Sequence, residues 1–187
     1  MTSWVDEATL INRRFYEQGA AAYANRWADR SFALHLYERF VSLIGHGCLV
    51  LDLGCGPAHD SAELAARGLR PVACAIARAM LYEARSHDAV RGLLVQCNLR
   101  VLPFETALFD GVWASASLLH IKKQDVSIAL SEVCRVLKSG GIFYNSMQEG
   151  EHDGLVPATP DEPIPGFRYY KLLPHRGVAS LGRGRRV

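Results

Sequence analysis

Short apolar runs alternate with longer amphipathic stretches through the middle of the chain. The apolar runs are too short for ordinary helices and are typical of buried strands, which we expect at 48–53, 71–76, 92–97, 109–115 and 141–147. The stretches between them place apolar side chains at helical spacing, and we expect helices at 59–68, 77–87 and 122–137. Strands that alternate with helices form βαβ units with right-handed crossovers. The pattern therefore predicts an α/β protein with a parallel sheet of about five strands and helices on both faces.

The two flanks differ from this core. Residues 1–46 carry apolar positions at helical spacing, and we expect an N-terminal helical cap there, followed by a core at 47–150. Residues 151–187 are rich in Pro and Gly, and the chain from Pro163 onward has six Lys or Arg and no acidic residue. We expect an irregular basic tail. Such an ending fits a natural short tail and also a truncated reading, and the sequence leaves both open.

Composition and charge narrow the class of protein. The chain has 187 residues, of which 49% are hydrophobic and 21% charged, as in one ordinary globular domain with a small cap at most. A net charge of +2 excludes a dominant electrostatic surface for nucleic acid or membrane. No apolar run approaches the roughly 20 residues of a membrane span, and the N-terminus lacks the basic and apolar regions of a secretory signal. We therefore expect a cytoplasmic protein without nucleic-acid or membrane partners.

The cysteine pattern argues against a disulfide framework or a metal site. The five cysteines are odd in number and none forms a C-x-x-C pair. Several lie in or beside apolar runs, where a reduced thiol acts as a small buried hydrophobic side chain. We expect no metal.

A glycine loop follows the first predicted strand, in the segment LVLDLGCGPAHD. Gly54 and Gly56 turn the chain into the next helix, at the edge of the sheet where α/β proteins bind ligands. A dinucleotide fingerprint would need a third glycine where His59 stands, and no phosphate-binding G-x-x-x-x-G-K-[ST] segment is present. Asp60 and Glu63 predict a capping box at the start of that helix.

The loop and four later segments together resemble one family. LVLDLGCG resembles motif I of the class I S-adenosylmethionine-dependent methyltransferases. RAML, LPF at 102–104, FDGVWASASLLHI at 109–121 and EVCRVLKSGGIFYNSMQEGE at 132–151 resemble the later motifs of that family, in order and at the expected spacing. The resemblance covers roughly residues 10–151. It implies a doubly wound Rossmann-like methyltransferase fold, S-adenosylmethionine as cofactor and a small-molecule methyl acceptor.

The resemblance also implies a set of cofactor-binding residues. The carboxylate of Asp52 would orient the amino group of the cofactor, with a buried strand-end carboxylate as the alternative. The cofactor's own carboxylate would lie near the N–H groups of the glycine loop. Met80 and Leu99 would contact the adenosine, although a role in core packing is an equal alternative for both. The full set is Asp52, Gly54, Cys55, Gly56, Ala75, Ile76, Met80, Asn98, Leu99, Ala114 and Ser115.

One candidate catalytic residue follows from the same resemblance. His120 lies just after the fourth predicted strand, near the expected entry of the acceptor, and could accept a proton or position a nucleophile. A histidine that caps the next helix or fills a polar gap is the alternative. Tyr16 and Tyr23 could cover the cofactor, with helix packing as their alternative role.

Three positions depart from the family pattern. Ala75 stands where an acidic residue usually accepts hydrogen bonds from both ribose hydroxyls, and Asn98 stands where an Asp usually accepts from adenine. Ala58 replaces the last glycine of the loop. Two hypotheses therefore remain: an active small-molecule methyltransferase, and a catalytically inactive protein of the same fold.

The C-terminal segment is the fourth departure. The family normally continues after the fifth strand with a helix and an antiparallel strand pair. FRYYKLL at 167–173 resembles the start of that continuation, but the residues after it do not. We expect the pair to be missing, which would expose the sheet edge at 142–147 and permit a homodimer through it.

Overall fold

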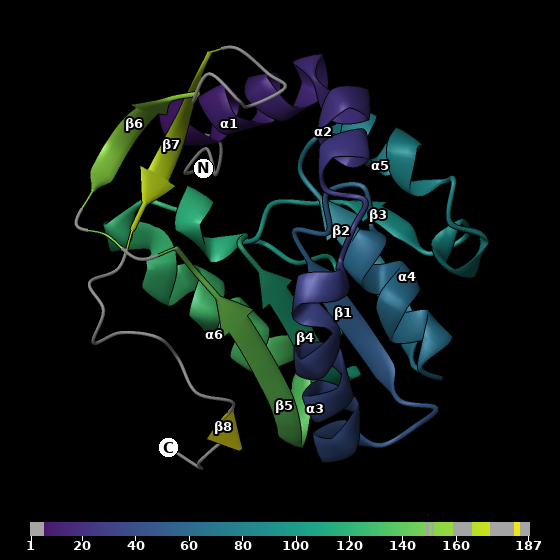
Figure 1. Ribbon diagram of the computed structural model, residues 1–187. Helices are drawn as coiled ribbons and strands as arrows, with labels where there is room; N and C mark the ends of the chain where they lie inside the picture. Colours follow the sequence, from purple (N-terminus) through teal and green to yellow (C-terminus); the bar gives the residue numbers. More distant parts are fainter. Residues whose placement is uncertain (1–5, 149, 151, 159–165, 173–181, 184–187) are drawn as a thin grey trace.

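The computed structural model describes residues 6–148, 150, 152–158, 166–172 and 182–183. Five parallel strands form the main sheet in the order β3-β2-β1-β4-β5, which confirms the predicted α/β fold (Figure 1). The strands are β1 Leu49–Leu53, β2 Arg70–Ala75, β3 Leu94–Gln96, β4 Phe109–Ser115 and β5 Leu137–Ser146. The order reverses between β1 and β4, so the chain after β1 and the chain after β4 diverge at a topological switch point.

Helices cover both faces of the sheet because side chains alternate along each strand. On one face, Val50, Trp113 and Tyr144 pack against α3. On the other face, Leu51 and Val112 pack against α6. The helices are α1 Glu7–Gln18, α2 Ala20–Arg26, α3 Leu34–Ile44, α4 His59–Ala66, α5 Arg78–Ala84 and α6 Val126–Val136.

The N-terminal helices take two different positions. α3 packs on the sheet through Tyr37 and Phe40, both fully buried. α1 and α2 instead lie across the carboxyl ends of the strands, above the sheet in Figure 1. They therefore form a roof over the edge where the glycine loop lies.

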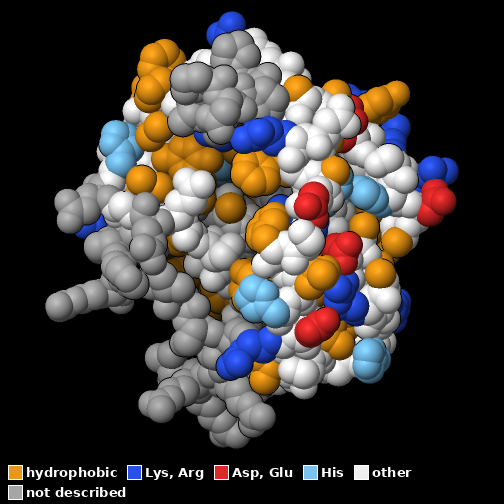
Figure 2. All heavy atoms as spheres, viewed as in Figure 1, with side chains coloured by type: hydrophobic (Ala, Val, Ile, Leu, Met, Phe, Trp, Pro, Cys, Tyr) orange, Lys and Arg blue, Asp and Glu red, His pale blue; other side chains and the backbone are white. Residues whose placement is uncertain are grey.

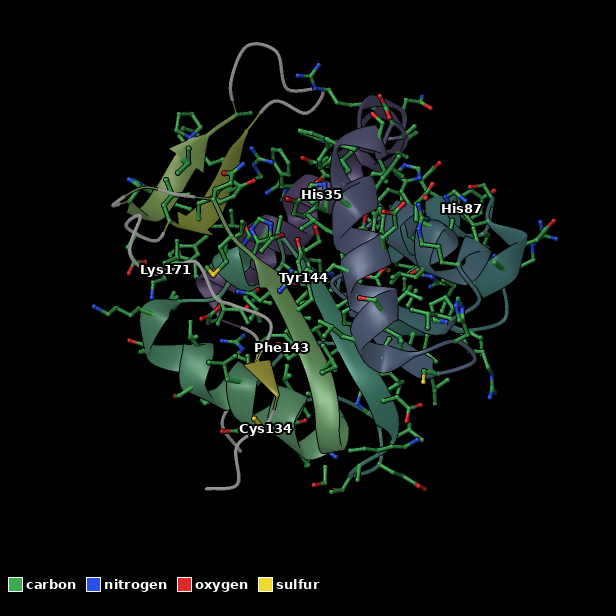
Figure 3. The ribbon with its side chains drawn as sticks, turned by 60° about the horizontal axis from the view of Figure 1, so that its bottom comes forward. His35, His87, Cys134, Phe143, Tyr144 and Lys171 are labelled. Atoms are coloured by element: carbon green, nitrogen blue, oxygen red, sulfur yellow. The ribbon has the colours of Figure 1, made fainter. Side chains whose placement is uncertain are left out.

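Two neighbouring residues of β5 show how its side chains divide between the faces. Tyr144 stacks on Trp113 with ring centroids 3.8 Å apart, whereas Phe143 packs with the cluster on the α6 face. Figure 3 labels both on this strand. The short strand β8 Gly182–Arg183 pairs antiparallel with Ile142 and Phe143. Part of the edge that we expected to be exposed is thus paired within the chain.

The expected irregular tail is wrong at two segments. β6 Asp153–Pro157 and β7 Phe167–Lys171 pair as an antiparallel hairpin beside α1. Tyr169 anchors β7 to α1. Its backbone N–H donates to Asn12 Oδ1 at 2.7 Å, and its carbonyl accepts from Asn12 Nδ2 at 3.2 Å. The Pro and Gly content of this segment does not predict a strand, and Asn12, the residue that holds β7 in place, is far away in the sequence. The rest of the expected tail, 173–181 and 184–187, lies outside the described residues.

The described surface carries both signs of charge. On the face shown in Figure 2, Lys and Arg side chains lie among Asp and Glu side chains rather than in one large patch. Within the described residues, no helix combines the length and the apolar character that a membrane span requires.

Candidate functional site

A cavity of about 340 Å³ lies at the carboxyl ends of β1, β2 and β4. Its floor is the glycine loop after β1 and the ends of the neighbouring strands. Its roof comes from α1 and α2 through Tyr16 and Tyr23, and its side wall comes from the β6–β7 hairpin through Arg168 and Tyr170. A cavity at the switch point of an α/β sheet is the usual ligand site of this architecture.

Most of the sequence-predicted residues meet in this cavity. Asn98 lies outside its lining, because the amide oxygen of its side chain accepts a hydrogen bond from the backbone N–H of Arg100 at 3.0 Å. Ala114 also lies outside, because its side chain is fully buried on the α6 face of the sheet. The predicted residues that line the cavity are Asp52, Gly54, Cys55, Gly56, Ala75, Ile76, Met80, Leu99, Ser115 and His120.

Gly54 makes a close contact within the protein, and the N–H groups of Gly54 and Cys55 differ from the expectation. A Cβ at Gly54 would lie 2.4 Å from Cβ of Ser117, so only glycine fits between the ends of β1 and β4. The N–H groups of Gly54 and Cys55 both donate to the Cys74 carbonyl, at 2.9 and 2.8 Å. We expected these donors to face an anion. They instead hold the loop against the end of β2.

Ala58 adopts the backbone conformation of the glycine that it replaces. Its φ is +62°, in the left-handed region that a Cβ disfavours. It directly precedes α4, where its side chain forms no cap hydrogen bond. The turn of the family motif is therefore retained with a residue that strains it.

Asp52 is a buried carboxylate at the cavity floor. Its Oδ2 accepts a hydrogen bond from the Ser61 hydroxyl at 2.6 Å. Burial, and then the negative charge of Asp60, raise the pKa of Asp52 to about 8. A buried carboxylate with a raised pKa favours either a proton or a cationic ligand.

Asp60 is a site residue that the sequence assigned to a different role. The expected capping box with Glu63 is wrong, because Asp60 points into the protein and Glu63 pairs with Arg67. The carboxylate of Asp60 accepts from the Tyr37 hydroxyl at 2.5 Å and from Trp113 Nε1 at 2.9 Å. Arg30 completes the network, with Nη2 2.5 Å from Asp60 Oδ1.

The three partners of Asp60 lie on α3, on β4 and in the chain just before α3, all distant from α4 in the sequence, so spacing alone did not reveal the network. Its position in the first turn of α4 is the ordinary place for a capping carboxylate. The one sequence signal for another role is Trp113, whose indole N–H needs a buried acceptor within an apolar strand.

His120 lies in the cavity wall with both ring nitrogens engaged. Nδ1 is 3.1 Å from the Tyr169 carbonyl, and Nε2 is 2.9 Å from the Tyr16 hydroxyl. Because a carbonyl only accepts, we assign the proton to Nδ1, and Nε2 then accepts from Tyr16. Desolvation lowers the pKa of His120 to about 4 against the effect of the Tyr169 hydrogen bond, and the charge of Arg168 lowers it further. The imidazole is therefore neutral at pH 7.

Other lining residues were not singled out as site residues from the sequence. Arg30, Asn12, Arg168 and Tyr170 all reach the cavity. The last two come from the hairpin that was expected to be irregular. Arg168 and Tyr170 reach the cavity because β7 packs against α1, a long-range contact that no local sequence pattern predicts.

Comparisons with known proteins agree with this architecture. A family model described as a methyltransferase domain matches residues 51–145. The chain is 31% identical over 127 residues to malonyl-[acyl-carrier protein] O-methyltransferase of Salmonella typhimurium, covering 68% of this chain and 46% of the relative. It is 29% identical over 153 residues to a sterol 24-C-methyltransferase of Schizosaccharomyces pombe, covering 77% of this chain and 38% of the relative. The chain spans about half or less of the length of these curated relatives.

A solved structure extends the likeness in fold to nearly the whole chain. The 1,6-didemethyltoxoflavin-N1-methyltransferase of Burkholderia thailandensis, with S-adenosylhomocysteine bound, superposes with a TM-score of 0.70. The match covers 94% of this chain and 77% of that protein, at 19% sequence identity. At this identity the likeness concerns the fold alone.

Proposed function

This chain belongs to the class I S-adenosylmethionine-dependent methyltransferases, and from that premise we propose that it methylates a small-molecule acceptor. The observation that carries the proposal is the cavity at the switch point, with the buried carboxylate of Asp52 at its floor. The relatives are named for malonyl-[acyl-carrier protein], a sterol and 1,6-didemethyltoxoflavin, which share no single chemistry. The acceptor is therefore inferred from this chain's own cavity.

The polar groups of the cavity floor fit the methionine end of the cofactor. An ammonium group beside Asp52 would supply the positive charge that a buried carboxylate requires. Among the described residues, the buried hydroxyl oxygen of Ser117 has no hydrogen-bond partner, and it lies in the lining beside Gly54. A ligand that carries polar groups at this end would satisfy both residues.

The ribose end of the site fits less well. Ala75 lines the cavity where the family places its acidic residue, and its methyl group accepts no hydrogen bond. Ile76 and Met80 offer apolar surface beside it. We infer that the cofactor binds chiefly through its methionine end and through apolar contact, and hence weakly.

S-adenosylmethionine supplies an electrophilic methyl group on a sulfonium, which already carries a good leaving group. The protein's part is to exclude water and to position the acceptor. Tyr16 and Tyr23 of the roof shield the cavity. Neutral His120 fixes the Tyr16 hydroxyl through Nε2, so that the hydroxyl presents an oriented oxygen to the acceptor.

A catalytically inactive protein of the same fold is the second candidate. Two observations favour it: the missing acceptor at Ala75, and the loop N–H groups that donate to the Cys74 carbonyl. Both would weaken cofactor binding. The two candidates differ in the binding that we expect: weak but saturable for the methyltransferase, and none at millimolar ligand for the inactive protein.

A titration with S-adenosylhomocysteine separates them. We expect saturable binding by calorimetry and a melting temperature that rises with ligand concentration. Asp52→Asn should weaken binding by about 10- to 100-fold, because a hydrogen bond to a charged group contributes about 1.5–3 kcal/mol. Asp88→Asn, at a side chain with 88% exposure, is the matched control and should bind as the wild type does. No shift in melting temperature at millimolar ligand would favour the inactive protein.

A further inference from the structure

Arg168 is a buried cation that the hairpin brings into the cavity wall. It lies on β7, and only 5% of its surface is exposed. Asn12 holds both backbone groups of the next residue, Tyr169, which fixes the register of β7 against α1. Since side chains alternate along a strand, Arg168 and Tyr170 lie on the same side of β7, and both line the cavity.

Aromatic rings hold the guanidinium of Arg168 in place. Its Cζ lies 4.7 Å from the ring centroid of Phe15 and 4.7 Å from that of Tyr170. Burial raises the pKa of the Tyr16 hydroxyl, and the charge of Arg168 opposes that rise, so the guanidinium lies near the hydroxyl that donates to His120. A planar cation stacked on aromatic rings has little freedom to turn away, so its charge is fixed relative to the cavity.

The charges of the cavity come from separate walls. The carboxyl groups of Asp52 and Asp60 come from the sheet and from α4. Asp52, with a pKa of about 8, is mostly protonated at pH 7 in the absence of a bound cation, and Asp60 is paired with Arg30. Arg168 comes from the hairpin, next to His120, which is neutral. The hairpin wall therefore contributes a guanidinium and an aromatic ring to the cavity, whereas the floor contributes carboxyl groups.

We propose that Arg168 and the aromatic side chains around it select an aromatic acceptor that carries an anionic oxygen group, such as a carboxylate. A guanidinium matches the two oxygens of a carboxylate in geometry as well as in charge. Tyr16, Tyr23 and Tyr170 offer ring surfaces on which a planar acceptor can pack. This inference rests on the proposed function, because it assigns the substrate class of the same site.

The test compares probes of nearly the same shape, one with an anionic carboxylate and the other with a neutral carboxamide. 4-Hydroxybenzoate is paired with 4-hydroxybenzamide, and indole-3-carboxylate with indole-3-carboxamide. Calorimetry gives each dissociation constant for the wild type and for Arg168→Gln, Arg168→Lys and Arg91→Gln. Arg91 is a matched control because its side chain is 64% exposed on the surface. Each titration is run with and without S-adenosylhomocysteine.

We expect at least one carboxylate to bind the wild type and Arg91→Gln about 10- to 100-fold more tightly than its amide, the usual range for a charged pair in a desolvated site. Arg168→Gln should abolish that preference and leave amide affinity unchanged. Arg168→Lys should retain part of it, since a lysine keeps the charge but not the planar fork.

Several results would overturn the inference. They are equal affinity for carboxylate and amide in the wild type, failure of every probe to bind, or an equal loss of both probes in Arg168→Gln. The last would show that Arg168 only holds the hairpin. Binding of S-adenosylhomocysteine without carboxylate preference would refute this inference alone. Carboxylate preference without S-adenosylhomocysteine binding would refute the proposed function alone.

Discussion

The indole Nε1 of Trp113 donates a hydrogen bond to Asp60 Oδ2 at 2.9 Å, beneath the floor of the cavity. The indole ring lies between two tyrosine rings, with centroids 5.0 Å from that of Tyr37 and 3.8 Å from that of Tyr144. The hydroxyl of Tyr37 donates to the other oxygen of the same carboxylate. The packing of α3 on the sheet and the orientation of Asp60 are therefore one structural unit.

Trp113→Phe should destabilise the fold through this unit. The substitution retains an aromatic ring but leaves Asp60 Oδ2 without its donor, and an unsatisfied buried acceptor costs about 1–3 kcal/mol. Urea denaturation should show a lower free energy of unfolding for Trp113→Phe. It should show no such loss for the control Trp27→Phe, because Trp27 is partly exposed. In an Asp60→Asn background the cost of Trp113→Phe should shrink. Equal costs in both backgrounds would mean that ring packing alone explains the effect.

Glu17 ties α1 to the start of α5. Its two carboxylate oxygens accept from the backbone N–H groups of Arg78 and Ala79, at 2.7 and 2.9 Å. Ala77 precedes α5 and has no side-chain acceptor, so a residue distant in the sequence caps this helix. Glu17→Gln should lower the free energy of unfolding by about 0.5–2 kcal/mol, the usual cost of losing a cap.

Hydrogen exchange gives the sharper test of this cap. The amides at the start of α5 should exchange faster in Glu17→Gln, as should those of α1 in the roof. Glu38→Gln, at an exposed position on α3, should change neither. Unchanged exchange at α5 in Glu17→Gln would contradict the capping role.

The elements of the sheet could be predicted from local patterns, because each strand is a short apolar run between turn residues. The β6–β7 hairpin could not. Asn12 fixes β7 from the other end of the chain, and neither partner indicates the other by sequence spacing. The local sequence pattern indicates where a strand can form. The position of β7, however, depends on its contact with Asn12, which is far away in the sequence.

The residues of the site likewise include some that the sequence predicts and some that it does not. Asp52 and Gly54 were predictable because a charge and glycines interrupt an apolar strand at its end. Asp60 was assigned to a cap, since a carboxylate in the first turn of a helix ordinarily compensates the helix dipole. Arg168 had no signal, because basic residues in a Pro- and Gly-rich segment also occur in solvated tails. The local sequence pattern does not predict contacts between elements that are far apart in the chain.

The raised pKa of Asp52 predicts a pH dependence of stability. An unfolded Asp titrates near ~3.9, whereas Asp52 in the folded protein titrates near pH 8. Between these values the unfolded chain loses a proton that the folded chain keeps, so this group lowers stability progressively as pH rises from about 4 to 8. Asp52→Asn should be free of that loss. The melting temperature of Asp52→Asn should therefore rise relative to that of the wild type as the pH increases from 5 to 8.

Asp88→Asn, at a side chain that is 88% exposed, is the control for the Asp-to-Asn substitution itself. Ligand binding offers a second readout. A cationic group beside Asp52 would release its proton, so S-adenosylhomocysteine should bind more tightly at pH 8 than at pH 6. A constant difference in melting temperature between Asp52→Asn and the wild type would contradict the raised pKa.

His120 predicts the opposite dependence. Its pKa is about 4 in the folded protein, below the ~6.5 of an unfolded histidine. The unfolded chain then binds a proton first as pH falls, so the stability that this group contributes above pH 6.5 is lost between pH 6.5 and 4. His120→Gln should lose less stability than the wild type over that range. His35→Gln, at an exposed histidine of α3 that Figure 3 labels, serves as control.

Nuclear magnetic resonance tests the same assignment directly. The ¹⁵N shifts of His120 should report a neutral ring with its proton on Nδ1 down to about pH 5, because Nδ1 donates to the Tyr169 carbonyl and Nε2 accepts from Tyr16. A charged ring at pH 6 would contradict the desolvated position of this residue.

Restoring a carboxylate at Ala75 should strengthen cofactor binding, if the ribose lies where the family places it. Ala75 lines the cavity at the end of β2 and is 5% exposed, packed with Cys55 and Leu81, so an Asp side chain there would be largely desolvated. Two hydrogen bonds to a charged acceptor, less the cost of ordering and desolvating it, leave a gain of about 2–3 kcal/mol. That corresponds to an S-adenosylhomocysteine dissociation constant about 30- to 150-fold lower. Ala75→Asn is the matched control, since it has the same shape without the charge, and it should gain much less. Ala75→Asp with equal or weaker affinity and a lower melting temperature would mean that the carboxylate is buried without partners and that no ribose binds beside it.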